Sequence, residues 1–245
     1  MQIISDEHLR KKLGLIIMTT EITMRNKFNG MEIPLVLAVI ALFCWHSPLL
    51  LPVKLLTVFF HELSHGLAAI LTGGSIVSIG LNLNQGGICY STGGWRFITA
   101  SAGYLGSLLW GCGLLLASMK RGINRSLTEA IGVLLLIAAA LWMRDFQSLA
   151  ISIITGLGLI YIAAKLNEKY CTVILRFISL VSCFYVVWDI KDDLIDRIIP
   201  GSDAYAISKM IFPQFMVGAG SYIVGIIWLA IAVYVLWKTF KIAFK

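Results

Sequence analysis

Apolar segments long enough to cross a bilayer recur along this chain, and one of them encloses His61-Glu62-Leu63-Ser64-His65. About 20 apolar residues in a helix span the hydrocarbon core of a membrane. Of the 245 residues, 58% are hydrophobic and only 13% are charged, whereas a soluble domain carries about 25% charged residues. The sequence therefore predicts a multi-pass integral membrane protein, although it does not indicate which membrane.

Seven apolar segments are candidate membrane-spanning helices. The first is short, and the leucine-rich run after Pro48 extends it. We predict an all-α polytopic fold of about six to seven transmembrane helices, forming a single domain over residues 31–245, with residues 1–30 as a basic surface tail. The segments are 33–45, 52–71, 97–119, 127–143, 146–164, 173–188 and 216–237.

The two histidines lie four positions apart in the second segment, and Glu62 follows the first of them. In a helix, positions i and i+4 share a face, so His61 and His65 can bind one metal ion. A neighbouring glutamate can act as general base on a metal-bound water. The alternative is a chance pentapeptide with two buried histidines, but ionisable groups inside a membrane segment indicate a functional site. The pattern predicts a Zn²⁺ site with Glu62 as catalytic base.

Residues 75–91 have a different periodicity. Apolar and polar residues alternate from Val77 to Asn84, which is typical of a strand, and Gln85-Gly86-Gly87 predicts a turn before a second strand. We therefore expect a small β-hairpin after the histidine helix, buried in protein or at the interface because open strand edges cannot face lipid. An extended substrate can pair with such an edge. The predicted substrate-binding residues are Ile79, Leu81, Asn82, Leu83, Gly86 and Gly87.

Catalytic zinc usually has three protein ligands and a water, so a further side chain is needed. Asp189 and Asp193 share a helix face, but that spacing also suits the charged end of a transmembrane helix. Asp145 adjoins Arg144 and suits a salt-bridged turn, and Ser202-Asp203 suits the start of a helix. The residues alone leave five candidates open: Asp145, Asp189, Asp192, Asp193 and Asp203.

Several segments resemble the M50B-like branch of the site-2-protease-type intramembrane metallopeptidases. They are His61 to Ala69, Thr72-Gly73-Gly74, Gly86-Gly87-Ile88, Ala102 to Ser107, Asp189 to Asp193, and Arg197 with Ser202-Asp203-Ala204. The resemblance implies a zinc-dependent endopeptidase with an aspartate as third ligand. Asp203 is favoured because Ser-Asp-Ala is common in this branch, with Asp193, Asp189 and Asp145 as alternatives. The Asn-Pro-Asp-Gly and Leu-Asp-Gly contexts of the wider superfamily are absent.

These observations predict a zinc metallopeptidase that cleaves transmembrane or membrane-proximal peptide bonds with a metal-activated water. The expected partners are a membrane-protein or peptide substrate and the lipid bilayer. Nucleic acid is not expected, because the net charge of +7 comes mostly from loop Lys and Arg, without an aromatic-interleaved basic patch or a Gly-rich phosphate loop. The alternatives are an inactive membrane scaffold, or a metal or ion transporter that uses the same His and Asp residues.

Overall fold

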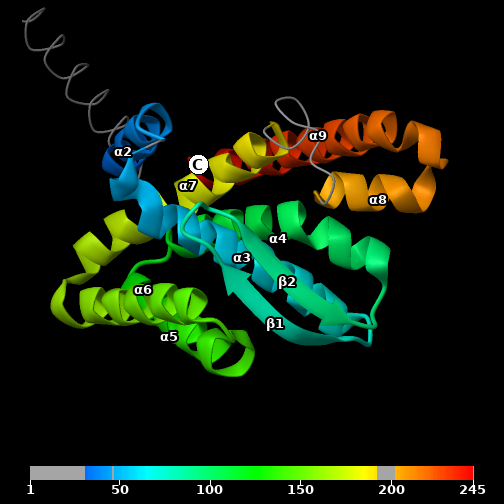
Figure 1. Ribbon diagram of the computed structural model, residues 1–245. Helices are drawn as coiled ribbons and strands as arrows, with labels where there is room; N and C mark the ends of the chain where they lie inside the picture. Colours follow the sequence, from blue (N-terminus) through cyan, green and yellow to red (C-terminus); the bar gives the residue numbers. More distant parts are fainter. Residues whose placement is uncertain (1–30, 46, 192–201, 245) are drawn as a thin grey trace, which may run out of the picture.

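The computed structural model describes residues 31–45, 47–191 and 202–244, and it is mostly helical (Figure 1). The predicted tail at residues 1–30 and the candidates Asp192 and Asp193 lie outside the described residues. The elements are α2 (Glu32–Phe43), η1 (Pro48–Leu50), α3 (Leu51–Leu71), β1 (Ser75–Leu81), β2 (Gly87–Thr92), α4 (Arg96–Ala117), α5 (Asn124–Trp142), α6 (Phe146–Lys165), α7 (Glu168–Lys191), α8 (Asp203–Ile211), η3 (Gln214–Met216) and α9 (Val217–Ala243).

Among the described residues, six helices are long and apolar enough to cross a membrane, and the protein is therefore a multi-pass membrane protein. The predicted first span is wrong as a crossing. Helix α2 has 12 residues, which at 1.5 Å each gives about 18 Å, short of the roughly 30 Å hydrocarbon core. The leucine-rich run after Pro48 belongs to the next helix instead, because Ser47 accepts a hydrogen bond from the Leu49 amide and starts a new helix there.

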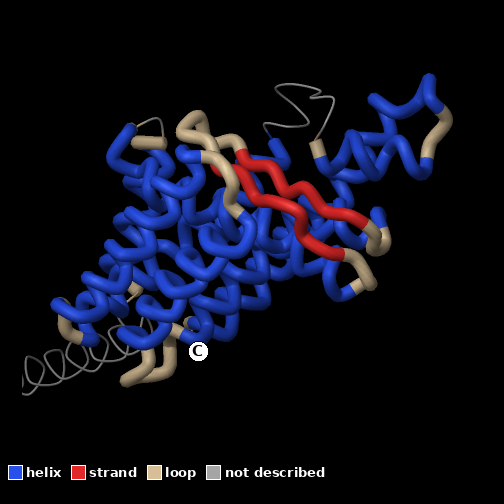
Figure 2. The backbone as a smooth tube through the Cα atoms, turned by 60° about the horizontal axis from the view of Figure 1, so that its bottom comes forward, coloured by secondary structure: helices blue, strands red, loops and turns tan. Residues whose placement is uncertain are grey.

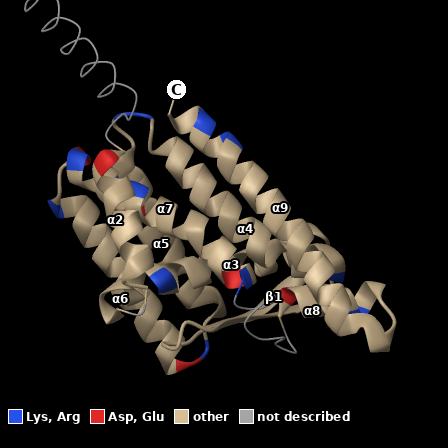
Figure 3. Cartoon of the chain, turned by 90° about the horizontal axis from the view of Figure 1, so that it is seen from above, with Lys and Arg blue, Asp and Glu red and all other residues tan. Residues whose placement is uncertain are grey.

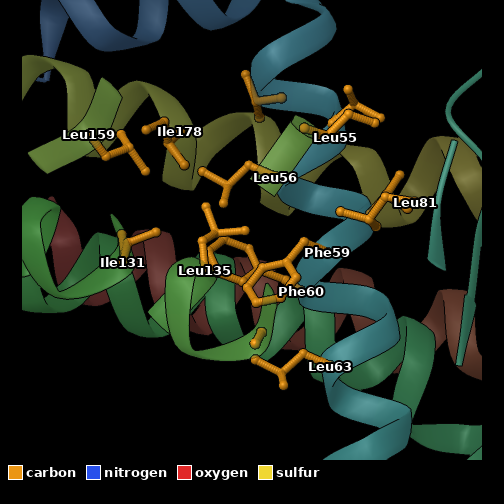
Figure 4. Close-up of a cluster of buried hydrophobic side chains, with 14 of the residues drawn as sticks. Leu55, Leu56, Phe59, Phe60, Leu63, Leu81, Ile131, Leu135, Leu159 and Ile178 are labelled. Carbon is orange, nitrogen blue, oxygen red and sulfur yellow. The ribbon is translucent and has the colours of Figure 1, made fainter. Parts of the chain in front are cut away.

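Helix α3 presents an apolar face to the interior of the bundle. Leu55, Leu56, Phe59, Phe60 and Leu63 recur at three- and four-residue spacing, which places these five side chains on one side of the helix. Figure 4 shows them packed against residues of β1, α5, α6 and α7. The labelled residues are Leu55, Leu56, Phe59, Phe60, Leu63, Leu81, Ile131, Leu135, Leu159 and Ile178. This packing fixes α3, so the histidines on its other face have a rigid support.

The predicted hairpin is present as two antiparallel strands that lie against the helices (Figure 2). The preceding helix ends as expected, because Gly73 adopts a φ of 88° beyond the last turn. A β-bulge between Ile76 and Ser78 interrupts the alternation, so Val77 is 50% exposed while Ile79 and Leu81 are buried. Strand β1 contacts α5 and α6, and both strands contact α3.

Helices α4, α7, α8 and α9 pack together beside α3. Helix α4 packs against α3 and α7, and α8 packs against α4 and α9. Gly103 and Gly106 of α4 approach α3 closely, since an added Cβ at Gly106 would overlap the Ser64 side chain. Charged residues are sparse along the helices (Figure 3). The few acidic and imidazole groups between α3, α4, α7 and α8 are therefore a distinct feature of the molecule.

Candidate metal centre

Three side chains from two helices converge between α3, α4 and α8. His61 Nε2 lies 3.2 Å from Asp203 Oδ2, and His65 Nε2 lies 3.2 Å from Asp203 Oδ1. One ligand atom from each of the three residues lies within 4.8 Å of the others, so the group can hold a metal ion. The histidines are one turn apart on α3, and their rings are 4.9 Å apart at an interplanar angle of 74°.

A backbone carbonyl of α4 orients the second histidine. His65 Nδ1 lies 2.7 Å from the Thr99 oxygen, and because a carbonyl only accepts hydrogen bonds, the Nδ1–H must donate. That bond leaves the Nε2 lone pair directed at the cluster. Metal-ligating histidines commonly donate their other ring N–H to a carbonyl or carboxylate in this way.

Two neighbours orient the first histidine. His61 Nδ1 lies 3.7 Å from Asp189 Oδ2 at the end of α7, which is an electrostatic contact too long for a hydrogen bond. The Tyr104 ring packs edge-on against the imidazole, with centroids 5.3 Å apart. Asp189 therefore faces Nδ1 of His61, whereas Asp203 faces Nε2 of the same ring.

The Asp203 carboxylate can face the histidines because another residue caps its helix. Ser202 is the N-cap of α8 and accepts a hydrogen bond from the Tyr205 amide at 3.3 Å. Burial raises the pKa of the Asp203 carboxyl, but the adjacent His65 and His61 imidazoles outweigh burial and lower the pKa to about 2. The carboxylate is therefore ionised at neutral pH, as a metal ligand must be.

Two observations show that these residues fit a metal ion. Asp203 Oδ2 lies 3.2 Å from His61 Nε2 but has no hydrogen-bond partner among the described residues, and buried oxygens usually have one. Gly103 of α4 faces the cluster, and a Cβ built there would overlap Asp203 Oδ2 and the Nε2 atoms of both histidines. The absence of a side chain at Gly103 thus preserves the space between the three ligand atoms.

Glu62 is buried beside the cluster, with 6% of its surface exposed. It is not a member of the three-residue group. The tip of the hairpin covers it, because an added Cβ at Gly87 would overlap Glu62 Oε1. The carboxylate therefore lies beside the histidines and against the start of β2, where it lines the cavity that opens on the cluster.

A cavity of 1420 Å³ opens on the cluster. Strand β2 lines one side of it, and α4, the end of α7 and α8 line the other. His61, Glu62, His65, Asp189 and Asp203 all reach this cavity. The hairpin edge that faces the site is therefore that of β2.

The structure separates the predicted substrate-binding residues into two groups. Gly86 and Gly87 line the cavity. Ile79 and Leu81 instead pack in the hydrophobic core. Asn82 and Leu83 form part of the turn, where the Asn82 amide donates to the Gly86 oxygen at 2.8 Å, and they do not line the cavity. A role in substrate binding remains a prediction for all six.

Asp145, the lowest-ranked ligand candidate, is occupied elsewhere. It caps α6, where its Oδ1 accepts from the Ser148 amide at 2.8 Å and its Oδ2 accepts from the Ser148 hydroxyl at 2.6 Å. The expected salt bridge to Arg144 is replaced by hydrogen bonds from Arg144 to the Met143 and Leu141 carbonyls. Asp145 is not part of the group that can hold a metal.

The Peptidase M50B-like family model matches residues 34–239, a range that begins within α2 and ends within α9. The chain belongs to the Peptidase M50B-like family. No curated protein and no solved structure matches it. The shared region of this M50B-like chain includes both histidines, Glu62 and Asp203.

Sequence reasoning missed the supporting residues of the site. Thr99 contacts His65 through a backbone oxygen, and Tyr104 contacts His61 edge-on through its ring. Neither type of contact has a sequence signature. Gly103 lies within the segment Ala102 to Ser107 that carries the family resemblance, but no role at the site is predicted for it. Its spacing of four from Thr99 is a signal, because it puts these two residues on one side of α4.

Proposed function

We propose that the chain is an intramembrane zinc metalloendopeptidase that cleaves transmembrane or membrane-proximal peptide bonds of membrane-protein or peptide substrates. The observation that carries this proposal is the convergence of His61, His65 and Asp203, with Glu62 adjacent, on a cavity next to a membrane-spanning helix. Membership of a peptidase family supports the same conclusion.

The donor set favours zinc. Two imidazole nitrogens and one carboxylate oxygen are ligands of catalytic zinc sites, which keep a fourth position open. His61 Nε2, His65 Nε2 and the Asp203 carboxylate would hold the ion. When bound there, Zn²⁺ lowers the pKa of a water in the open position and polarises the scissile carbonyl.

Glu62 is the proposed general base. Its carboxylate takes a proton from the attacking water and later passes it to the leaving amine. Thr99 and Asp189 keep the two imidazoles oriented during these steps. Burial of Glu62 beneath the hairpin tip limits its contact with other water.

The substrate is proposed to bind as an extended segment along the free edge of β2. A transmembrane helix hides its peptide bonds in internal hydrogen bonds, so it must unwind locally before cleavage. The β2 edge can replace those hydrogen bonds by strand addition. Gly87 lies at the start of this edge, directly over Glu62, which brings the paired substrate backbone close to the base.

Substitution of Glu62 by Gln tests the proposal. Zinc should stay bound, while cleavage of a single-span reporter in proteoliposomes should fall by about 10²–10⁴-fold, the usual contribution of a general base. Glu129→Gln on the exposed face of α5 is the matched control, and it should leave both zinc and cleavage unchanged. Retained cleavage by Glu62→Gln would sink the assignment of the base, and loss of zinc would make Glu62 structural.

A further inference from the structure

The cavity next to the metal centre is aromatic at one end. Trp45, Tyr185 and Trp188 line it there, beside Val58 and the start of β2. The Trp45 ring centroid is 6.0 Å from each of the other two. Lys54 fixes Trp45, because its ammonium donates to the Trp45 oxygen at 2.5 Å and lies 5.0 Å from the ring. This end therefore offers a preformed apolar surface.

The opposite end is basic. Arg96, at the start of α4, and Lys209, in the last turn of α8, both line the cavity with Thr92 at the end of β2. Figure 1 shows that α4 begins at the same end of the molecule at which α8 ends. The candidate metal centre lies between the two ends of the cavity. Gly103, which faces it, comes after Arg96 on α4, and Asp203 comes before Lys209 on α8.

Arg96 and Lys209 have no acidic partner within 4.0 Å among the residues that the structure describes. The ammonium of Lys209 lies 5.8 Å from the Tyr205 ring, which leaves its charge free to interact. Trp95, next to Arg96, is 62% exposed, and an exposed Trp at a helix end is typical of the membrane interface. The basic end thus meets the aqueous boundary of the membrane.

From these positions we infer that the site selects substrates with an acidic residue on one side of the cleaved bond and a large apolar residue on the other. The inference rests on the proposed function and names its substrate class: membrane proteins with an acidic juxtamembrane segment. Because β2 runs from the aromatic end to the basic end, a segment paired with it must contact both ends at once.

Discrimination should come more from repulsion than from attraction. A partly exposed ion pair contributes about 0–1 kcal/mol, so one glutamate gains little. A lysine in the same place would face two cations, and such like-charge contacts exclude wrong partners. Lipid phosphates can also bind cations at the interface, but Arg96 and Lys209 line the same cavity as the metal ligands.

The test uses reporters that carry Glu, Gln or Lys at matched distances on the N-terminal or the C-terminal side of the cleaved bond. The full-length protein should prefer Glu to Lys by about tenfold in kcat/KM on one side only. The side that responds gives the direction of the substrate strand. Arg96→Glu with Lys209→Glu should reverse the preference. Lys120→Glu with Arg121→Glu, an equal charge change in the α4–α5 loop, should not.

Binding of the same peptides to the Glu62→Gln variant separates this inference from the proposed function. If no reporter is cleaved but the variant still binds the Glu peptide about tenfold more tightly than the Lys peptide, the peptidase proposal fails and the subsite stands. Equal cleavage and equal binding of both peptides overturn the charge subsite. A preference that persists in the reversed-charge variant overturns it as well, and assigns the two cations to lipid.

The aromatic end has its own test. Trp188→Ala should reduce the preference for Phe over Ala on the other side of the bond, while the Glu-to-Lys ratio stays the same. Trp188→Leu, which keeps apolar volume, should retain most of the preference for Phe. An unchanged Phe-to-Ala ratio in Trp188→Ala would remove the aromatic half of the proposal.

Discussion

Helices α6 and α8 both begin with an aspartate and a serine, but in opposite order along the chain. At α6 the aspartate comes first: Asp145 is the N-cap, and both of its oxygens bind Ser148. At α8 the serine comes first: Ser202 is the N-cap, and Asp203 in the first turn has a carboxylate directed at His61 and His65. The Asp145 carboxylate binds within its own helix, whereas the Asp203 carboxylate contacts the histidines of α3.

The difference shows how capping decides which aspartate is available as a ligand. An N-cap side chain bonds to an amide two or three residues later, so Asp145 has little capacity left. When serine takes the cap, the next residue projects from the first turn, where the helix dipole also favours negative charge. Ser202 thus frees Asp203 for the histidines of α3.

Replacement of Asp203 by Ala should give the largest effect. Loss of a metal ligand should weaken zinc binding by more than about 100-fold, because loss of an outer partner already costs about 10–100-fold. Asp145→Ala should leave zinc bound, since that carboxylate binds Ser148. Metal analysis of the two purified variants, beside His65→Ala, checks this. Zinc lost from Asp145→Ala and kept by Asp203→Ala would reverse the comparison.

A smaller effect is expected when the ligand space is filled from α4. The added methyl of Gly103→Ala would overlap the three ligand atoms, and overpacking costs about 1–3 kcal/mol, or about five- to 150-fold in zinc affinity. Gly113→Ala on the same helix is the matched control, because nothing lies within 4 Å of its added Cβ. Equal zinc affinities for the two variants would show that Gly103 does not border the metal.

Asp189→Asn should weaken zinc binding less, by about tenfold, because Asp189 contacts the far nitrogen of His61 and not the metal position. Zinc titration of this variant beside Asp203→Ala ranks the two aspartates. A loss as large as that of Asp203→Ala would make Asp189 a ligand and Asp203 a secondary residue.

Most of the fold could be predicted from the sequence because hydropathy and periodicity are local signals. The period of two predicts the hairpin, and the apolar segment 52–71 predicts the end of α3. The prediction of a crossing at residues 33–45 is wrong because composition does not separate the apolar end of α2 from the apolar helix that starts after Ser47. The β-bulge at Val77 shifted which residues face inward, and bulges have no strong sequence signature.

The site could be predicted only in part. His61, Glu62 and His65 lie within five residues, so one helix places them. The partner from α8 is about 140 residues away, and spacing cannot show which aspartate returns to α3. The cap at Ser202 looked like a reason to discount Asp203, whereas the structure shows the opposite relation. Which strand edge faces the cavity depends on how the hairpin packs, and this is a tertiary property.

The smallest expected effect concerns the cap at α6 and involves stability alone. Asp145→Ala should lower the stability by about 1 kcal/mol, the usual contribution of an N-cap, with no change in zinc content. Asp145→Asn keeps a good capping side chain and should restore most of the loss. Thermal unfolding of the three proteins in one detergent measures the differences.

The same residue gives a pH dependence with a definite sign. The hydrogen bonds from Ser148 lower the pKa of the Asp145 carboxyl in the folded protein. Its stabilisation is therefore complete above the unfolded pKa of about 3.9 and is lost as the pH falls through the lower folded value. Asp145→Asn should lack this part of the acid sensitivity. If the wild type and Asp145→Asn lose stability in parallel as the pH falls below about 3.9, Asp145 is not the ionised cap of α6, and its contrast with Asp203 fails.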